Sequence, residues 1–352
     1  MAILRSKKVK ITALCCALPK EEKNIFDVGK GYFDEETIKK TASPIGVEKI
    51  FFAAKGQTAS DLCFEAADHL INKISLKRSE IDGLIFATQT PDYPAPASSC
   101  ILQDRLELSK DCFTMDINAG CPAFVNAWYI AANMIESRSC KKILILIGDT
   151  LREKISPADR GLSFIISDAA SAILIESAEE DHVSTTVAKT DGSAYEALII
   201  PAGGSRLPCS EETGIMEDAE EGNKRRKEDL YMDGMGVFTF AVKEVPSIIK
   251  ETADLHGISL EDVDYFLLHQ ANAYMLKFIA KRAKIPMEKI PINIGKYGNT
   301  NGSTIPLLIN DLAEKELKEP KNMIMSGFGI GLSWAAVAMK MGGFRCAEII
   351  RV

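Results

Sequence analysis

Cys121 stands where an apolar segment gives way to a helical one, and this position could make its thiol a nucleophile. The segment Cys112–Ile117 predicts a buried strand, and apolar residues recur at helical spacing from Pro122 to Met134. Proline suits a first helical position because it needs no amide hydrogen bond there. The helix dipole and free amides should lower the pKa of the thiol and could stabilise an oxyanion on an attached thioester. The alternative is a small core residue, as for most of the nine cysteines.

His269 and Asn299 are the other residues whose setting suggests chemistry. His269 follows the apolar run Phe266–Leu268, and Asn299 lies in a turn flanked by glycines. The chain has only four histidines, and the other three lie in a helix or in polar turns. Functional groups in open α/β sheets collect at the C-terminal ends of strands. We therefore expect His269 to be a catalytic residue.

Composition limits the classes of protein to consider. The 352 residues allow two or three domains, and 46% hydrophobic residues are ample for large cores. A net charge of −7 gives no support for a nucleic-acid surface. Neither a disulfide framework, a signal peptide nor a membrane span is indicated, and no Cys-x-x-Cys pair or His-rich cluster suggests a metal. We expect a protein of the reducing cytoplasm.

Apolar strands alternate with helices through the first half of the chain. The strands are expected at Lys10–Leu18, Ile81–Thr88, Lys142–Gly148 and Asp168–Ile175, and the helices at Thr58–Lys73 and Ser98–Leu108. A polar, charged segment separates the first strand from the first helix. This alternation predicts an α/β layer architecture with a largely buried sheet.

The second half of the chain repeats the pattern of the first. The pairs are Glu80–Gln89 with Glu261–Gln270, the strand, turn and helix at Cys121 with Ile290–Pro306, and the strand ending at Gly148 with Asn322–Gly327. The spacings agree. Gln89 and Cys121 are 32 positions apart and Gln270 and Asn299 are 29 apart, while Cys121 and Gly148 are 27 apart and Asn299 and Gly327 are 28 apart. We predict one half over residues 1–178, carrying the cysteine, and another over 179–352, carrying the histidine and asparagine. Pseudo-twofold packing of the halves would bring these three residues together.

A polar insertion interrupts the second half at about residues 205–229. It is rich in Glu, Lys and Arg and poor in apolar residues, so we expect a surface excursion or a mobile flap. The run Lys224–Lys227 within it is typical of solvated surface.

Four motifs resemble those of β-ketoacyl-acyl-carrier-protein synthase III. They are Asp116–Cys121, His269–Asn272, Tyr297–Ser303 and Gly327–Trp334, and they follow one another in the order found in that family. The resemblance covers nearly the whole chain. It implies the thiolase fold, in which two duplicated α/β halves form α-β-α-β-α layers, and the initiating condensation of bacterial fatty acid synthesis.

The resemblance implies a role for each candidate residue. Cys121 would accept the acyl group of a thioester. His269 and Asn299 would donate hydrogen bonds to a malonyl thioester and stabilise the enolate that forms as carbon dioxide leaves. The carbanion would then attack the acyl-cysteine in a Claisen condensation. The amides of Cys121 and Ile330 would form the oxyanion hole. Thioesters of coenzyme A or phosphopantetheine would be the substrates, with no other cofactor.

Several positions depart from the family pattern and bear on the substrate. Glu35–Lys49 lacks the Trp and Arg that hold coenzyme A, Tyr274 replaces an Arg that docks the carrier protein, and Ile330 replaces a Gly. The substrate-binding positions implied by the resemblance are Ala95, Gly234, Met235, Phe238, Ala271, Asn272 and Phe328. Ala95 stands where a bulky aromatic of the partner subunit limits acyl length. These departures favour a larger or carrier-bound acyl donor, as in a specialised pathway.

The helix after His269 presents basic residues on one face. Lys277, Lys281, Arg282 and Lys284 could dock an acidic carrier protein, or could form an ordinary solvated face. The family's usual twofold dimer is expected, with no nucleic-acid or membrane partner.

Two other functions are consistent with the same residues. An acyltransferase on this fold would pass the acyl group from Cys121 to an alcohol or amine. A cysteine hydrolase also uses Cys, His and Asn in this order, although the residues around them here lack that pattern. A non-catalytic partner subunit is a weaker alternative, because such subunits normally lack the nucleophile.

Overall fold

The computed structural model describes residues 2–313 and 315–352, so Met1 of the predicted first half lies outside the described residues. Most strands belong to two large sheets. The seven-stranded sheet contains β2 (Val9–Leu18), β5 (Gly83–Ala87), β6 (Phe113–Ile117), β7 (Lys142–Asp149), β8 (Ala169–Ser177), β17 (Arg345–Cys346) and β18 (Ile350–Arg351). The five-stranded sheet contains β1 (Ala2–Ser6), β9 (Ser184–Thr190), β14 (Tyr265–Leu268), β15 (Lys321–Gly329) and β16 (Ser333–Met341).

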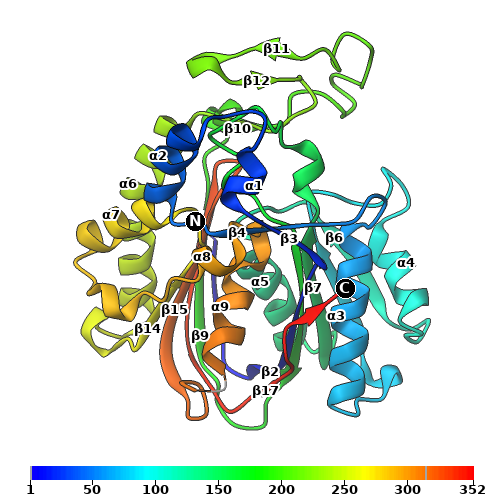
Figure 1. Cartoon of the computed structure of the whole chain (residues 1–352). Coiled ribbons are helices and arrows are strands. Elements are labelled where there is room, and N and C mark those ends of the chain that lie inside the picture. The colour runs from blue at the N-terminus through cyan, green and yellow to red at the C-terminus, as the bar shows by residue number, and fades with distance from the viewer. Residues whose placement is uncertain (1, 314) are drawn as a thin grey trace.

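Helices separate the sheets and cover their outer faces (Figure 1). Helices α5 (Ala123–Glu136) and α9 (Thr304–Ala313) share one apolar core with both sheets. Helices α3 (Ala59–Lys73) and α4 (Ser98–Arg105) pack on the outer face of the seven-stranded sheet. Helices α6 (Gly234–His256) and α7 (Ala273–Ala283) cover the five-stranded sheet. The α-β-α-β-α layers expected from the sequence are confirmed.

The repeat found in the sequence reappears as equivalent strand positions. The order β2-β8-β7-β5 in one sheet corresponds to β9-β16-β15-β14 in the other. Within each run the last two strands are parallel and the others antiparallel. The terminal strands cross over, because β1 pairs with β9 while β17 and β18 pair with β2. The boundary between halves at residues 178 and 179 stays a prediction.

Local sequence explains where the elements begin and end. Thr58 caps α3 through a capping box with Asp61, as Ser and Thr caps commonly do. Strand β7 is buried along almost its whole length because strands flank it on both sides and helices cover both faces. Helix α5 begins at Ala123, one residue after the predicted start.

Two expectations about strands are wrong. The Cys112–Ile117 segment forms β6, which is an edge strand and not a buried one, and Phe113 is 51% exposed. The segment Ile290–Asn293 forms no strand but leads into α8 (Ile294–Tyr297). A short apolar run does not itself show whether a neighbouring strand is present.

The polar segment that follows β2 contains regular structure. It forms β3 (Glu21–Asn24), α1 (Ile25–Gly29), α2 (Glu35–Ile45) and β4 (Lys49–Phe52). Strands β3 and β4 pair with each other, and Ile38, Ile50 and Phe164 contribute to a separate small core.

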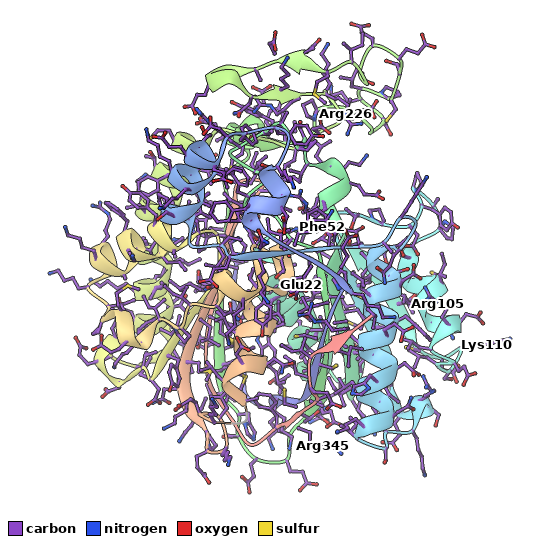
Figure 2. All side chains as sticks on the ribbon, viewed as in Figure 1. Glu22, Phe52, Arg105, Lys110, Arg226 and Arg345 are labelled. Carbon is purple, nitrogen blue, oxygen red and sulfur yellow. The ribbon has the colours of Figure 1, made fainter. Side chains whose placement is uncertain are left out.

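The polar insertion projects beyond the two sheets as a hairpin (Figure 1). Its strands are β11 (Glu217–Asp218) and β12 (Lys224–Arg225), and the short strands β10 (Leu198–Ile199) and β13 (Tyr231–Met232) pair at its base. Figure 2 shows Arg226 beside this hairpin and Phe52 nearer the body of the protein. Within the residues described here, no helix has the length and apolar character needed to cross a bilayer.

Candidate active site

Cys121, His269 and Asn299 line one cavity of about 170 Å³. Cys121 comes from the turn between β6 and α5, His269 from the end of β14, and Asn299 from the loop between α8 and α9. The predicted site residues Ile330, Gly234, Phe238, Ala271, Asn272 and Phe328 line the same cavity. Most of the remaining wall is apolar, formed by Leu151, Leu162, Ile165, Ile166, Leu198, Leu230, Met232, Val237 and Met275. The cavity can therefore hold a largely apolar ligand with its reactive group near polar side chains.

Glycines allow close approach of the backbone around Cys121. A Cβ at Gly329 would lie 2.7 Å from Sγ of Cys121, and one at Gly327 would lie 2.6 Å from Cα of Pro122. A side chain at either position would displace the nucleophile turn or strand β15. Both glycines belong to the Gly327–Trp334 motif, and the lack of space at these two positions explains why the motif has glycine there.

The environment of the Cys121 thiol differs from the expected one. Hydrogen bonds from the amides of Ile330 and Cys121 lower the pKa of the thiol, in the direction expected for a helix start. Burial acts more strongly, and together with the nearby Asp149 it raises the pKa to about 12. The expectation of a lowered pKa is therefore wrong, because the sequence shows the turn but not the desolvation. The free thiol is protonated at neutral pH.

His269 is buried and held at both its backbone and its ring. Its amide donates to the carbonyl of Ser326 at 2.9 Å, and Nδ1 lies 2.8 Å from Oγ1 of Thr304. The ring also meets the edge of Phe328, with 5.5 Å between ring centres. Burial lowers the pKa of the imidazole to about 3, so His269 is neutral at physiological pH.

The hydrogen bond of Thr304 determines whether Nε2 of His269 is a donor or an acceptor. Its hydroxyl lies within hydrogen-bond distance of both Nδ1 and the carbonyl of Asn301, the latter at 3.0 Å. Donation to the carbonyl requires a proton on Nδ1 and leaves Nε2 as an acceptor. Donation to Nδ1 instead places the proton on Nε2, which then becomes a donor.

Asn299 is fixed by three hydrogen bonds to the backbone. Its amide donates to the carbonyl of Ile165 at 2.8 Å, and its carbonyl accepts from the amide of Ser167 at 2.9 Å. Oδ1 accepts from the amide of Asn301 at 2.9 Å. Because Oδ1 is occupied by a donor, the Nδ2 amide group is the part of the side chain suited to donate to a ligand.

A buried network beside the site was missed in the sequence. Asp149, at the end of β7, accepts from the Gln89 amide at 2.7 Å and from Nδ2 of Asn301 at 2.8 Å. Oε1 of Gln89 also accepts from Nδ2 of Asn301 at 3.1 Å. Burial raises the pKa of Asp149 to about 7. The network ties the loop of Asn299 to the sheet that carries Cys121. The sequence feature that could have indicated this network is Asp149, an acidic residue directly after an apolar strand.

Some predicted site residues lie outside the cavity. Ala95 is exposed on the loop before α4. Met235 is 74% exposed and lines a separate surface hollow, together with Phe240 and Trp334. Lys277, Lys281 and Arg282 are exposed on α7, and the exposed Lys284 caps its C-terminus. The substrate role of Ala95 and Met235 stays a prediction.

The described residues offer no obvious metal site. Among residues 2–313 and 315–352, no three His, Cys, Asp or Glu side chains come together so that they could hold a metal ion. Five cysteines are buried, namely Cys15, Cys16, Cys63, Cys112 and Cys140.

Comparisons with known proteins agree in both sequence and structure. The family model for 3-oxoacyl-[acyl-carrier-protein (ACP)] synthase III matches residues 115–192, and the model for its C-terminal part matches residues 253–341. The β-ketoacyl-[acyl-carrier-protein] synthase III of Clostridium perfringens (strain SM101 / Type A) is 35% identical over 301 residues, covering 85% of this chain and 89% of that protein. A putative 3-oxoacyl-[acyl-carrier-protein] synthase 3 of Campylobacter jejuni is 31% identical over 342 residues, covering 95% of this chain and 94% of that protein.

Solved structures extend the similarity to the whole chain. A 3-oxoacyl-(acyl-carrier protein) synthase from Burkholderia xenovorans LB400 has a TM-score of 0.93 and 33% identity. The match covers 100% of this chain and 99% of that one.

Proposed function

The chain belongs to the β-ketoacyl-[acyl-carrier-protein] synthase III family, and we propose that Cys121, His269 and Asn299 carry out its reaction. It is an acyltransferase of the thiolase fold that condenses an acyl group with malonyl-acyl-carrier-protein and releases carbon dioxide. One observation carries the assignment of residues. The three side chains come from distant segments of the chain and line the same cavity.

Cys121 accepts the acyl group in the first step. Its sulfur attacks the thioester carbonyl, and the thiol of the donor leaves with the proton that Cys121 loses. The lone pair of neutral His269 provides an acceptor for that proton when Thr304 donates to Asn301. The amides of Cys121 and Ile330, which hydrogen-bond the thiol in the free chain, are suited to stabilise the oxyanion.

His269 and Asn299 act in the second step. Nδ2 of Asn299 and a protonated Nε2 of His269 donate to the carbonyl oxygen of the malonyl thioester. As the carbon–carbon bond to the carboxylate breaks, its electron pair forms an enolate that these donors stabilise. The enolate carbon attacks the carbonyl of the acyl-cysteine, and Cys121 leaves as a thiolate that takes up a proton from solvent. Decarboxylation itself creates the carbanion, so the step requires no metal or redox cofactor.

The cavity wall takes the remainder of the substrate. Gly234, Phe238, Ala271, Asn272 and Phe328 line the cavity and are proposed to contact the pantetheine arm or the acyl chain. Ala95 is exposed on its own chain, as expected if it reaches the cavity of a partner subunit. A larger acyl donor remains our proposal for this chain.

An acidic carrier protein is proposed to dock beside the cavity. Helix α7 directs Lys277, Lys281 and Arg282 to solvent, while its opposite face is buried against the core. Asn272, which caps this helix, also lines the cavity. Positive charge on a helix whose first residues border the cavity would steer an acidic partner toward the site.

We also propose a homodimer in the cytoplasm. Strand β6 ends the seven-stranded sheet, and among the described residues no strand pairs with its outer edge, where Phe113 is exposed. An isologous twofold contact would pair β6 with its copy in antiparallel fashion and remove this edge. The exposed free thiols of Cys100 and Cys209 are compatible with a reducing compartment.

The proposed roles predict different defects for different variants. We expect Asn299→Ala to keep an acyl adduct on Cys121 and His269→Ala to load Cys121 more slowly, because only His269 also accepts the proton of the thiol. Both variants should lower condensation about 100- to 1000-fold, because each removes a donor to the enolate. His256→Ala, at a histidine outside the cavity, is the matched control. Intact-mass spectrometry measures loading, and carbon dioxide release from malonyl carrier protein measures condensation. Wild-type condensation rates in both site variants would contradict the roles.

Acyl transfer to an alcohol or amine without carbon dioxide release would favour the acyltransferase alternative.

A further inference from the structure

The polar insertion at about residues 205–229 interrupts the chain at the wall of the substrate cavity. Leu198 precedes the insertion, Leu230 and Met232 follow it, and all three line the cavity. The insertion therefore bears directly on the shape of the cavity, although its hairpin projects from the body (Figure 1).

Arg225 fastens the insertion to the loop after β7. Its guanidinium donates from Nη1 to Oδ2 of Asp159 at 2.9 Å and from Nη2 to Oε2 of Glu220 at 2.6 Å. The side chain of Asp159 is 4% exposed and that of Arg225 is 13% exposed. Exposed ion pairs contribute little to the stability of the fold. Loss of one partner from a pair shielded from solvent is costly, because it leaves the other charge unpaired. Arg225 is thus not the solvated residue expected from the run Lys224–Lys227.

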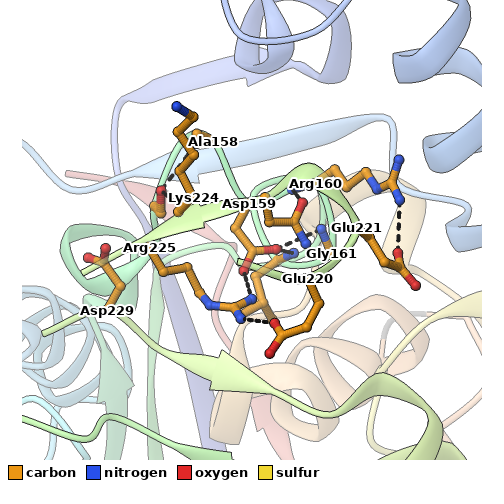
Figure 3. A network of polar contacts seen from close by, with 12 residues as sticks. Ala158, Asp159, Arg160, Gly161, Glu220, Glu221, Lys224, Arg225 and Asp229 are labelled. Carbon is orange, nitrogen blue, oxygen red and sulfur yellow. Dashed lines mark hydrogen bonds and ion pairs between the residues drawn. The ribbon is translucent and has the colours of Figure 1, made fainter. Parts of the chain in front are cut away.

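Further hydrogen bonds reinforce this attachment (Figure 3). The amide of Arg160 donates to Oδ1 of Asn223 at 3.1 Å, and its guanidinium donates to Glu221 at 2.8 Å. The amide of Lys224 donates to the carbonyl of Ala158 at 3.2 Å. The insertion is consequently seated on residues 156–161 by both backbone and side chains.

Asp159 transmits the attachment to the cavity wall. Its Oδ1 accepts from the amides of Gly161 and Leu162, at 2.8 and 3.3 Å. Leu162 packs in one apolar cluster with Ile166 and Leu230, and these side chains line the cavity. The amide of Leu230 donates to the carbonyl of Lys154 at 2.7 Å. The two sides of the wall are therefore joined at the Arg225–Asp159 pair.

The same loop supports Asn299. The carbonyl of Ile165 and the amide of Ser167 hold the backbone of Asn299 from both sides. Ile165 follows Leu162 by only three positions, so displacement of the wall would also disturb this contact.

We propose that the Arg225–Asp159 pair determines specificity by fixing Leu162 and Leu230 as the wall against which an aliphatic acyl thioester packs. The inference rests on the proposed function and adds a substrate class to it. An apolar wall held in place discriminates between acyl chains of different length. In a well-formed apolar pocket, each added or missing methylene changes kcat/KM by about 10- to 200-fold. A released wall discriminates less.

Variants at the pair test the proposal. Arg225→Met retains an aliphatic stem against Tyr231, whose ring lies 4.9 Å from the guanidinium carbon. Asp159→Asn retains an acceptor for the amides of Gly161 and Leu162. Arg225→Lys keeps the charge, and Lys224→Met is the control, since the Lys224 side chain is 57% exposed and pairs with the exposed Asp218.

The measurement is the second-order rate of acyl loading on Cys121 for straight-chain acyl thioesters of increasing length. We expect Arg225→Met and Asp159→Asn to lower the ratio between the best donor and the donor two carbons longer by at least about fivefold. The double variant should add little, because both changes remove the same pair. Lys224→Met should stay within about twofold of wild type, and Arg225→Lys should lie between. Proteolysis after glutamate within the insertion should also accelerate in the two pair variants.

A second set of variants leaves the ion pair intact. Leu230→Ala should move the preferred donor to a longer chain, and Leu230→Phe to a shorter one. An unchanged donor profile in the pair variants and the Leu230 variants, with normal loading, would overturn the inference while leaving the proposed function in place. Additive effects of Arg225→Met and Asp159→Asn would overturn it as well. Absence of an adduct in the wild-type chain would overturn the proposed function.

Discussion

At the scale of single residues, burial governs the chemistry of the site more than helix position does. Desolvation raises the pKa of Cys121 to about 12 and lowers that of His269 to about 3, so the free site contains a thiol and a neutral imidazole. The amides of Ile330 and Cys121 act in the opposite direction on the thiol. We therefore expect the sulfur to be activated only when the thioester is bound, with the thiol losing its proton as the sulfur attacks the carbonyl.

The raised pKa of Cys121 predicts how its alkylation depends on pH. Below the pKa the thiolate fraction grows about tenfold per pH unit, so reaction with neutral iodoacetamide should accelerate steadily from pH 7 to 10 without a plateau. Peptide mapping follows Cys121, and the exposed Cys100 in the same digest reports on the reagent. A plateau by pH 8 would show that the thiol ionises easily in the folded chain.

At the scale of elements, two turns and a strand end bring the reacting groups together. The end of β15 passes so close to Cys121 that Gly329 has no room for a side chain. The Asp149–Asn301 hydrogen bond joins the end of β7 to the loop before α9. Each contact links a segment of one sheet to a segment that borders the other.

A methyl group at Gly329 should therefore disable the site. Its Cβ would lie 2.7 Å from Sγ of Cys121, and we expect Gly329→Ala to lower acyl loading at least about 100-fold, because misplacement by about 1 Å costs that much. Gly204→Ala is the control, since a Cβ there meets no atom within 4 Å. Loading by intact mass and circular dichroism of both variants check the prediction. Wild-type loading in Gly329→Ala would mean that the turn readily moves away.

The sequence predicted the elements with regular patterns better than their surroundings. The fully apolar run of β7 and the capped helix α3 were identified correctly, because period and capping are local properties. The exposed edge of β6 and the partly buried position of Arg225 depend on which segments pack nearby, and a local pattern does not contain that information. For the same reason the sequence placed Cys121 at a helix start and misjudged its pKa.

At the scale of the whole molecule, two similar sheets enclose α5 and α9, and the cavity lies where the two halves meet. The exposed edge of β6 continues the seven-stranded sheet toward a second copy in the proposed dimer. Pairing of two such edges would place the exposed Ala95 loop of one subunit near the other, as the substrate proposal requires.

The proposed interface predicts that one charge separates the subunits. We expect wild type to sediment as a dimer and Phe113→Glu as a monomer, because each subunit would then place a charge without a partner in the contact between the two β6 strands. Phe26→Glu is the matched control, since Phe26 is similarly exposed on α1. Analytical ultracentrifugation distinguishes the outcomes. A dimeric Phe113→Glu variant would place the interface elsewhere.

Intact-mass spectrometry after exposure to a panel of acyl thioesters tests the assignment of the nucleophile most directly. We predict one acyl adduct per wild-type chain, the same adduct in the control Cys100→Ala, and none in Cys121→Ala. An adduct that persists in Cys121→Ala would show that another residue receives the acyl group, and would contradict the proposed mechanism.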